Sequence, residues 1–311
     1  MSAEDLIKMD KNMKHSKIAV IGAGTVGSTT AYALLLKNIV AEIILVDIDE
    51  ARCHGEILDL SDALAFDGAS KIRSGSSKDA SEADIIVIAA GRAQKPGETR
   101  AELLTTNKTI ITDIFTAIKP INPQAIVIMV TNPLDALTAL AQSLSGLPRN
   151  QVFGTGTFLD TLRLRGIIAE KTNVAKSSVH AYVIGEHGDS QCVAWSSAEI
   201  AGISIAQFAG IEKKDFESIA QQAKNTAYEI IACKGSTHFG IAACVAAICE
   251  AIVFDQKLVM PLSTYIQEYD TVFSMPAILG ENGIERILPI PLDDLEQKKL
   301  TDSAEQLRQL I

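Results

Sequence analysis

KIAVIGAGTVG, residues 17–27, is an apolar run followed by a G-x-G-x-x-G motif. The run predicts a buried strand, and Thr25–Lys37, rich in alanine and leucine and free of proline, predicts a helix. Between the two elements, Gly22 permits a tight turn, Gly24 lets a phosphate approach the backbone, and Gly27 lets helix pack on strand. The N-terminus of the helix would then face the phosphates. The stretch predicts a dinucleotide site.

An acidic residue follows at the distance that this site requires. The second apolar run, Glu42–Val46, stops at Asp47, where dinucleotide-binding folds carry an acid for the ribose hydroxyls. A purely structural glycine turn does not explain this acid. Asp49 and Glu50 come next and would repel a 2′-phosphate, which favours NAD over NADP. Arg52 is the nearest cation, and we expect it at the surface or on the adenosine side.

The first half of the chain alternates strands with helices. Its apolar runs are continuous, which is typical of strands buried on both faces of a parallel sheet. Further strands are predicted at 84–90 and 125–130, and helices at 51–64 and 100–118. The pattern predicts an α/β fold, a Rossmann-type doubly wound parallel sheet, at 17–153, after an N-terminal extension at 1–16.

The second half, 154–311, reads as a mixed α+β catalytic domain without a flexible linker before it. Asn282-Gly283 is a strong hairpin-turn signal. Strands are predicted at 179–184, 191–194, 258–265 and 271–276, and helices at 157–171, 213–231, 239–255 and 292–310.

Composition limits the classes of function. The 311 residues favour one large domain or two ordinary ones, and a net charge of −10 argues against nucleic-acid binding. We find neither a secretory signal nor a run long enough to span a membrane. The five cysteines form no C-x-x-C pair, which indicates free thiols in a reducing cytosol. The sequence thus predicts a cytoplasmic protein without a metal site.

Three polar segments are candidates for the reaction centre. VIGEHGDS, 183–190, places His187 between glycines and acids that can fix its tautomer and raise its proton affinity, although a solvated loop histidine is commoner. Asp160 and Arg163 share a helix face, which by itself indicates only a modest salt bridge. GRAQKPGETR, 91–100, follows a strand at the ligand-binding end of the sheet and reads as a lid or as an ordinary solvated loop.

Taken together, the motifs resemble the L-lactate/malate dehydrogenase family, and most closely its bacterial L-lactate dehydrogenases. The resemblance runs from Lys17 to the C-terminal helix. It is carried by five motifs in order, Gly22–Gly27, Gln94–Arg100, Thr131–Pro133, Asp160–Arg163 and Gly185–Ser190.

The resemblance implies a role for each matching residue. His187 would be the acid/base of pyruvate reduction, Asp160 its orienting partner, and Arg163 the clamp on the substrate carboxylate. Arg100 would polarise the substrate carbonyl. Asn132 and Thr237 would complete the substrate pocket. The implied contacts to NAD are Gly22, Gly24, Val26, Gly27, Asp47, Arg52, Gly91, Val130 and Asn132.

Gln94 stands at the position that the family uses to choose its substrate. Malate dehydrogenases carry arginine there and lactate dehydrogenases glutamine, which agrees with the cost of burying a second substrate carboxylate without a cation. The resemblance therefore implies an L-lactate dehydrogenase acting on pyruvate and (S)-lactate in fermentative glycolysis. The alternative is a malate or broad-specificity L-2-hydroxyacid dehydrogenase, if Arg92 or Lys95 turns inward. A third alternative is a non-catalytic dinucleotide-binding protein of the same fold, which the loss of His187, Arg163 or Arg100 would have supported; all three are present.

Regulation is the last implication. Arg165 and His180 match the pair that binds fructose 1,6-bisphosphate between subunits of allosteric bacterial members, with surface or core residues as the alternative. In that case the effector would favour an active homotetramer.

Overall fold

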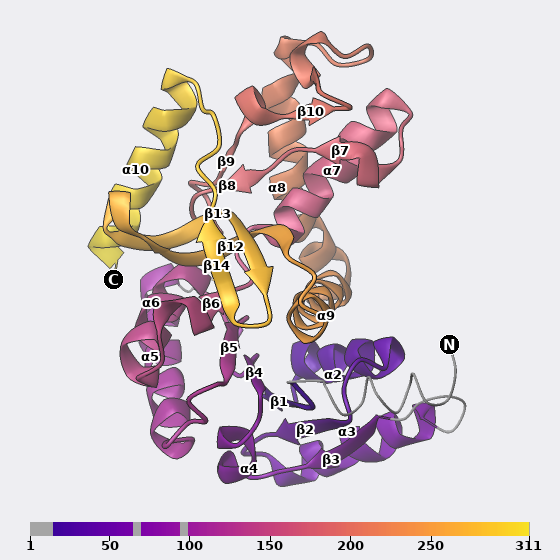
Figure 1. Ribbon diagram of the computed structural model, residues 1–311, viewed down its shortest axis with the longest axis vertical. Coiled ribbons are helices and arrows are strands. Elements are labelled where there is room, and N and C mark those ends of the chain that lie inside the picture. The colour runs from indigo at the N-terminus through magenta and orange to yellow at the C-terminus, as the bar shows by residue number, and fades with distance from the viewer. Residues whose placement is uncertain (1–14, 65–69, 94–98, 311) are drawn as a thin grey trace.

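The computed structural model describes residues 15–64, 70–93 and 99–310. Its main element is a nine-stranded sheet in the order β14-β13-β12-β6-β5-β4-β1-β2-β3 (Figure 1). From β3 to β6 the strands are parallel, in the 3-2-1-4-5-6 order of doubly wound dinucleotide-binding folds, which confirms the predicted fold class. These strands are β1 (Lys17–Ile21), β2 (Glu42–Val46), β3 (Lys71–Ser74), β4 (Ile85–Ile88), β5 (Ile126–Met129) and β6 (Val152–Gly154).

Helices cover both faces of the parallel strands. One face packs against α2 (Thr25–Lys37), α3 (Glu50–Ala63) and α9 (Phe239–Val253), and the other against α4 (Ser77–Ser81), α5 (Arg100–Ala117) and α6 (Leu134–Ser145). Successive residues of a strand therefore enter opposite apolar clusters, and β1, β2, β4, β5 and β6 are buried along most or all of their length, whereas the edge strand β3 is partly exposed. This double cover is why the strands appear in the sequence as continuous apolar runs.

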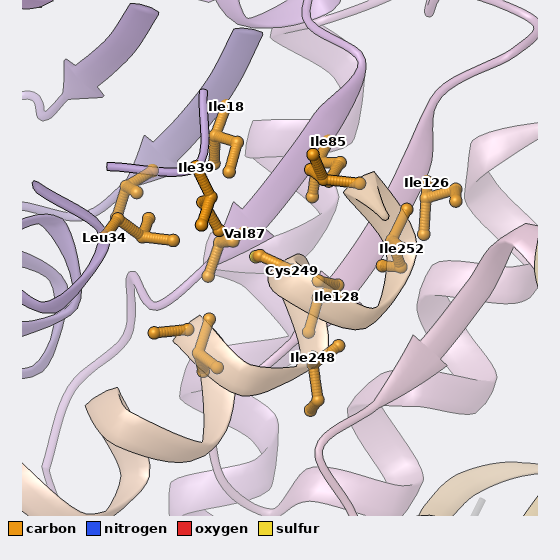
Figure 2. Close-up of a cluster of buried hydrophobic side chains, with 14 of the residues drawn as sticks. Ile18, Leu34, Ile39, Ile85, Val87, Ile126, Ile128, Ile248, Cys249 and Ile252 are labelled. Carbon is orange, nitrogen blue, oxygen red and sulfur yellow. The ribbon is translucent and has the colours of Figure 1, made fainter. Parts of the chain in front are cut away.

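Helix α9 comes from the second half of the chain but packs against the sheet of the first half. Figure 2 shows Cys249 and Ile252 of α9 beside Ile128 and Ile126 of β5, with Leu34 of α2 in the same cluster. All these side chains are fully buried. The two halves thus share one hydrophobic core.

A three-stranded antiparallel meander extends the sheet beyond β6. It consists of β12 (Leu258–Ile266), β13 (Thr271–Gly280) and β14 (Gly283–Ile287), and β12 joins β6 in antiparallel orientation where Ser263 pairs with Gly154. The predicted hairpin at Asn282-Gly283 is confirmed, since Gly280 pairs with Gly283 across the turn. Gly283 has φ 90°, and a Cβ there would collide with the Asn150 carbonyl.

The rest of the second half is mixed, as predicted. Two small sheets lie here, one in the order β11-β10-β7 and one of β8 and β9. The elements are α7 (Phe158–Thr172), β7 (Val179–His180), β8 (Val183–Ile184), β9 (Cys192–Val193), β10 (Glu199–Ile200), β11 (Ile203–Ser204), α8 (Phe216–Lys234) and α10 (Asp294–Leu310).

Some local predictions were wrong. The single strand predicted at 179–184 is two strands in different sheets, because the Ala181 carbonyl accepts a hydrogen bond from Arg165 instead of a strand neighbour. Strands β3 and β6 and helix α6 were not predicted, since β3 is a partly exposed edge strand, β6 has three residues and α6 follows directly on Pro133.

Two expectations from composition can be compared with the structure. All five cysteines are free, with Cys233 exposed and the other four buried, as expected. Within the described ranges, no helix is long and apolar enough to cross a membrane.

Candidate active site

The glycine motif forms a tight turn between β1 and α2. Gly22 has φ 107°, and a Cβ there would lie 2.6 Å from the Ala90 backbone nitrogen. A Cβ on Gly27 would collide with the Gly22 carbonyl, whereas one on Gly24 would meet no atom within 4 Å. The first and third glycines are therefore required by packing. Gly24 is the N-cap of α2 and leaves open space before the helix N-terminus, where a pyrophosphate fits.

Asp47 lies against this turn. Its Oδ2 accepts the Ala23 backbone N–H at 2.5 Å, and its Oδ1 accepts that of Asp49 at 2.9 Å. The carboxylate thus sits beside the glycine cradle at the carboxyl end of β2. Arg52 is exposed, and its Nε lies 3.8 Å from the Asp49 carboxylate. The cradle and this acidic edge fit a dinucleotide that lacks a 2′-phosphate.

The carboxyl ends of β1, β4 and β5 follow one another without a gap. Gly22 packs against Ala90, and a Cβ on Gly91 would collide with Thr131. The Thr131 hydroxyl donates to the Ala90 carbonyl at 2.7 Å. Val130 is half-buried at the end of β5, and Asn132 is exposed just beyond it. The predicted cofactor residues of β1, β4 and β5 therefore lie along one edge of the sheet.

Asn107 joins two of these loops and was missed in the sequence. It is fully buried in α5, where its Nδ2 donates to the Asn132 carbonyl at 2.7 Å and its Oδ1 accepts the Arg92 backbone N–H at 2.9 Å. An asparagine among the apolar positions of a helix was the available signal, because a buried amide must find partners.

His187, Asp160 and Arg163 come together although His187 is 27 residues from Asp160. Asp160 Oδ2 lies 2.7 Å from His187 Nδ1, and its Oδ1 accepts from Arg163 Nη1 at 3.2 Å. The Asp160 side chain is 5% exposed, that of Arg163 11% and that of His187 28%. The carboxylate is thus enclosed, while the imidazole keeps access to a ligand.

The pair perturbs both pKa values. Burial acts to lower the pKa of His187, but the carboxylates of Asp160 and Asp135 outweigh it and the pKa lies above the ordinary value. Burial acts to raise the pKa of Asp160, but His187 and Arg163 outweigh it and hold that pKa below its ordinary value. The surroundings of His187 therefore favour its imidazolium form more than water does for an isolated histidine.

Hydrogen bonds from three other elements hold the backbone around His187. The residues that make them, Ser274, Ser303 and Asp135, were not predicted from the sequence. Gly185 and Ser274 of β13 exchange two backbone hydrogen bonds of 2.9 and 3.0 Å. The Glu186 N–H donates to the Ser303 hydroxyl at 3.1 Å, and the His187 N–H donates to Asp135 at 2.7 Å. Nothing in the local sequence signals these partners.

Other predicted site residues lie apart from this group or outside the described residues. Gln94 is outside them, and Arg100 begins α5 without a described side chain. Thr237 is half-buried between α8 and α9. Arg165 donates through Nε to the Ala181 carbonyl at 3.0 Å, and burial lowers its pKa. His180 is exposed on β7, one residue before that carbonyl.

A doubly wound sheet whose strand ends carry a dinucleotide cradle, joined to a histidine–aspartate–arginine group, is the arrangement of a dinucleotide-dependent dehydrogenase. Comparison with known proteins narrows this class. The family model of the lactate/malate dehydrogenase NAD binding domain matches residues 16–154, and that of the lactate/malate dehydrogenase α/β C-terminal domain matches residues 157–311. The chain therefore belongs to the lactate/malate dehydrogenase family, and its cofactor is NAD.

Individual relatives cover nearly the whole chain. L-lactate dehydrogenase A of Rhizopus oryzae is 45% identical over 94% of this chain and 92% of its own. An L-lactate dehydrogenase of Clostridium botulinum (strain 657 / Type Ba4) is 41% identical over 96% and 97%. Two solved structures are similar with a TM-score of 0.91.

Both of these structures are described as lactate dehydrogenases. One, from a Medee basin deep-sea metagenome library, is 37% identical and covers 96% of this chain and 98% of its own. The other is the minor L-lactate dehydrogenase of Enterococcus mundtii in a ligand-bound form, 35% identical, with 95% and 97% covered.

Proposed function

We propose that the chain is an L-lactate dehydrogenase that interconverts pyruvate and (S)-lactate with NAD. The observation that carries the proposal is the Asp160 carboxylate, which contacts both His187 Nδ1 at 2.7 Å and Arg163 Nη1 at 3.2 Å. It holds a proton donor and a carboxylate-binding cation side by side. The L-lactate dehydrogenases among the relatives support the same substrate.

His187 is the acid of pyruvate reduction. Because Nδ1 is engaged by Asp160, Nε2 is the ring nitrogen that is free to donate a proton to the ketone oxygen. Asp160 orients the ring and stabilises the imidazolium before the transfer. NAD, when bound in its reduced form, supplies the hydride to the carbonyl carbon.

Two arginines handle the negative charges of the substrate. Arg163 uses one Nη atom for Asp160 and offers its remaining N–H groups to the substrate carboxylate. Arg100, at the start of α5 after the predicted lid, polarises the carbonyl. Asn132 and Thr237 complete the substrate contacts, with Asn132 held by Asn107.

Cofactor contacts follow the edge of the sheet. Gly22, Gly24 and Gly27 form the pyrophosphate cradle, and Asp47 accepts the ribose hydroxyls. Val26, Gly91, Val130, Asn132 and the exposed Arg52 complete the proposed NAD contacts. In this proposal 17–153 is the NAD-binding domain and 154–311 the substrate-binding domain.

Gln94 selects the substrate. A neutral glutamine suits the pyruvate methyl group, whereas oxaloacetate brings a second carboxylate that needs a cation. Steady-state NADH oxidation with pyruvate and with oxaloacetate tests this selection. We expect the wild type to prefer pyruvate and Gln94→Arg to move the ratio of kcat/KM values toward oxaloacetate. A wild type that prefers oxaloacetate would establish the malate or broad-specificity alternative.

Regulation is proposed at Arg165 and His180. They come from adjoining elements, since Arg165 bonds the carbonyl of the residue after His180. In a cytoplasmic homotetramer of fermentative glycolysis, fructose 1,6-bisphosphate would bind the pair at a subunit interface. NADH oxidation with and without this compound tests the proposal. Activation lost in Arg165→Gln supports the site, and a wild type that never responds contradicts it.

A further inference from the structure

A cavity of about 450 Å³ lies between α6, the connection from β12 to β13, and α10, which adjoin one another in Figure 1. Its size is that of a small-molecule site, about 300–1,000 Å³. Arg149 lines it just before β6 begins, and Gln142 Nε2 of α6 donates to the carbonyl of Val152, the first residue of β6, at 2.8 Å. The cavity therefore lies at the amino end of β6, whereas the proposed active site lies at the carboxyl ends of the strands.

Two arginines from distant parts of the chain line this cavity. Arg149 forms no ion pair with any residue that the structure describes, and its guanidinium lies over the Tyr265 ring, 3.7 Å from the ring centroid. Arg308 of α10 approaches Glu305, with 3.8 Å between Nη2 and Oε1, and both of these side chains are about half exposed. Because exposed ion pairs contribute little, both guanidinium groups keep N–H donors for a ligand.

The charge of the cavity lining is positive, in contrast to that of the whole chain. Among the described residues of the lining, one carboxylate, Asp270, stands against the two arginines, and it accepts the Tyr265 hydroxyl at 2.6 Å. The chain as a whole has a formal net charge of −10. A local excess of cations overrides this overall field and attracts anions. We therefore expect the ligand of the cavity to be an anion.

Thr271 adds a buried hydroxyl that has no partner. The residue begins β13, lines the cavity and is 5% exposed. Its Oγ1 is one of two buried side-chain polar atoms in the described part of the chain that form no hydrogen bond. An unpaired buried hydroxyl costs free energy, and folded proteins nearly always supply a partner for such a group. An acceptor oxygen of a ligand in the cavity would be that partner.

We propose that this cavity binds a small oxyanion between the guanidinium groups of Arg149 and Arg308, with the Thr271 hydroxyl donating to one of its oxygens. Guanidinium groups match the geometry of phosphate and of carboxylate, so the ligand carries one of these two groups. Arg165 and His180 are not in the lining, so the cavity is separate from the proposed effector pair. The inference goes beyond the proposed function and does not depend on it.

Calorimetric titration of the NADH-bound protein with inorganic phosphate and, separately, with citrate tests the proposal. Bound NADH occupies the pyrophosphate cradle, and chloride keeps the ionic strength constant. We expect saturable binding of at least one anion, with a Kd that rises about tenfold or more in Arg149→Gln and in Arg308→Gln. Binding of phosphate alone identifies a phosphoryl ligand, and binding of citrate alone identifies a polycarboxylate. A protein that binds neither anion overturns the proposal.

Two further variants locate the bound anion. Arg286→Gln is the matched control, because Arg286 is an exposed arginine of β14 outside the lining and its loss changes the net charge equally. We expect this variant to bind the anion as the wild type does. Equal weakening in Arg286→Gln and Arg149→Gln would show a general charge effect and overturn the proposal. Binding that is lost in Arg165→Gln and unchanged in Arg149→Gln would assign the anion to the other site and also overturn it.

Thr271→Val tests the hydroxyl without changing the charge. Valine has nearly the shape of threonine and suits a strand, but it lacks the unpaired group. We expect the variant to melt at a higher temperature than the wild type when no anion is present, because the unpaired hydroxyl is gone. We also expect its Kd for the anion to rise about fivefold, the effect of one lost hydrogen bond. A variant that binds the anion as tightly as the wild type overturns the proposed geometry.

Discussion

The apolar core between the sheet and α9 and the polar group around His187 are both buried, but different forces hold them. In the core, aliphatic side chains such as Ile128 and Ile252 need only mutual contact and exclusion of water. Around His187, each charged group depends on a particular partner at hydrogen-bond distance. The core therefore determines whether the chain folds. The polar group determines what the folded chain can do, and part of it is held at a cost in stability.

The largest expected effect is on activity, and it comes from a substitution in the polar group around His187. We expect His187→Asn to lower kcat for pyruvate reduction by about 10²- to 10⁴-fold, the usual contribution of a general acid. NADH binding, measured by fluorescence titration, should be unchanged because the cradle lies at Gly22–Gly27. The melting temperature should also stay close to that of the wild type. A variant with full activity would show that the proton donor has been misassigned.

Truncating a side chain in the apolar core should instead lower the stability of the protein and leave the chemistry of the active site unchanged. Ile128→Ala removes a fully buried side chain from the central strand β5. We expect the free energy of unfolding to fall by about 2–5 kcal/mol, measured by urea denaturation. The pH profile of the folded enzyme should not move, because Ile128 has no polar partner to lose. If that profile shifted, the two regions would be more strongly coupled than we infer.

Asp135→Asn sharpens the comparison further, because it removes a buried charge and leaves the apolar core unchanged. Burial raises the pKa of the Asp135 carboxyl to about 6, although hydrogen bonds from Ser263 and the His187 backbone oppose it. The folded state therefore binds more protons than the unfolded state between about pH 4 and pH 6. Wild-type stability is lost as pH rises through this window, and the loss is complete above it.

The Asp135→Asn variant has no carboxyl group at this position, so it does not lose stability in this way as the pH rises. We expect Asp135→Asn to be more stable than the wild type at pH 8, by at most about 3 kcal/mol, and equal to it near pH 4. Urea denaturation at the two pH values measures the difference. If the variant were less stable at pH 8, the hydrogen bonds to the charged carboxylate would outweigh the cost of its burial.

The smallest expected effect comes from a surface residue that belongs neither to the apolar core nor to the polar group around His187. Ser76 caps α4 at the surface, where its side chain accepts the Asp79 backbone N–H and donates to the Asp79 carboxylate at 2.6 Å. We expect Ser76→Ala to cost about 1 kcal/mol of unfolding free energy, with kcat and KM unchanged. A change in kcat or KM would show that the capping interaction of Ser76 also affects the cofactor site.

Predictions from sequence succeeded where the cause of structure is local. Strands β1, β4 and β5 were found because burial on both faces makes their residues continuously apolar. The glycine turn was found because its steric requirements fall on neighbouring residues. Helix α6 was missed because the reading stopped at Pro133, although proline is well tolerated just before a helix.

The sequence by itself determined the alternation of elements, the cofactor turn, and the His187, Asp160 and Arg163 side chains as candidates. Only the tertiary structure decided that Asp135, Asn107 and Ser263 serve the same site, and that α9 completes the core of the first half. The physical reason is the range of the interactions. Hydrophobic periodicity is written into neighbouring residues, whereas the partner of a buried polar group can lie anywhere along the chain, and its identity depends on how the elements pack.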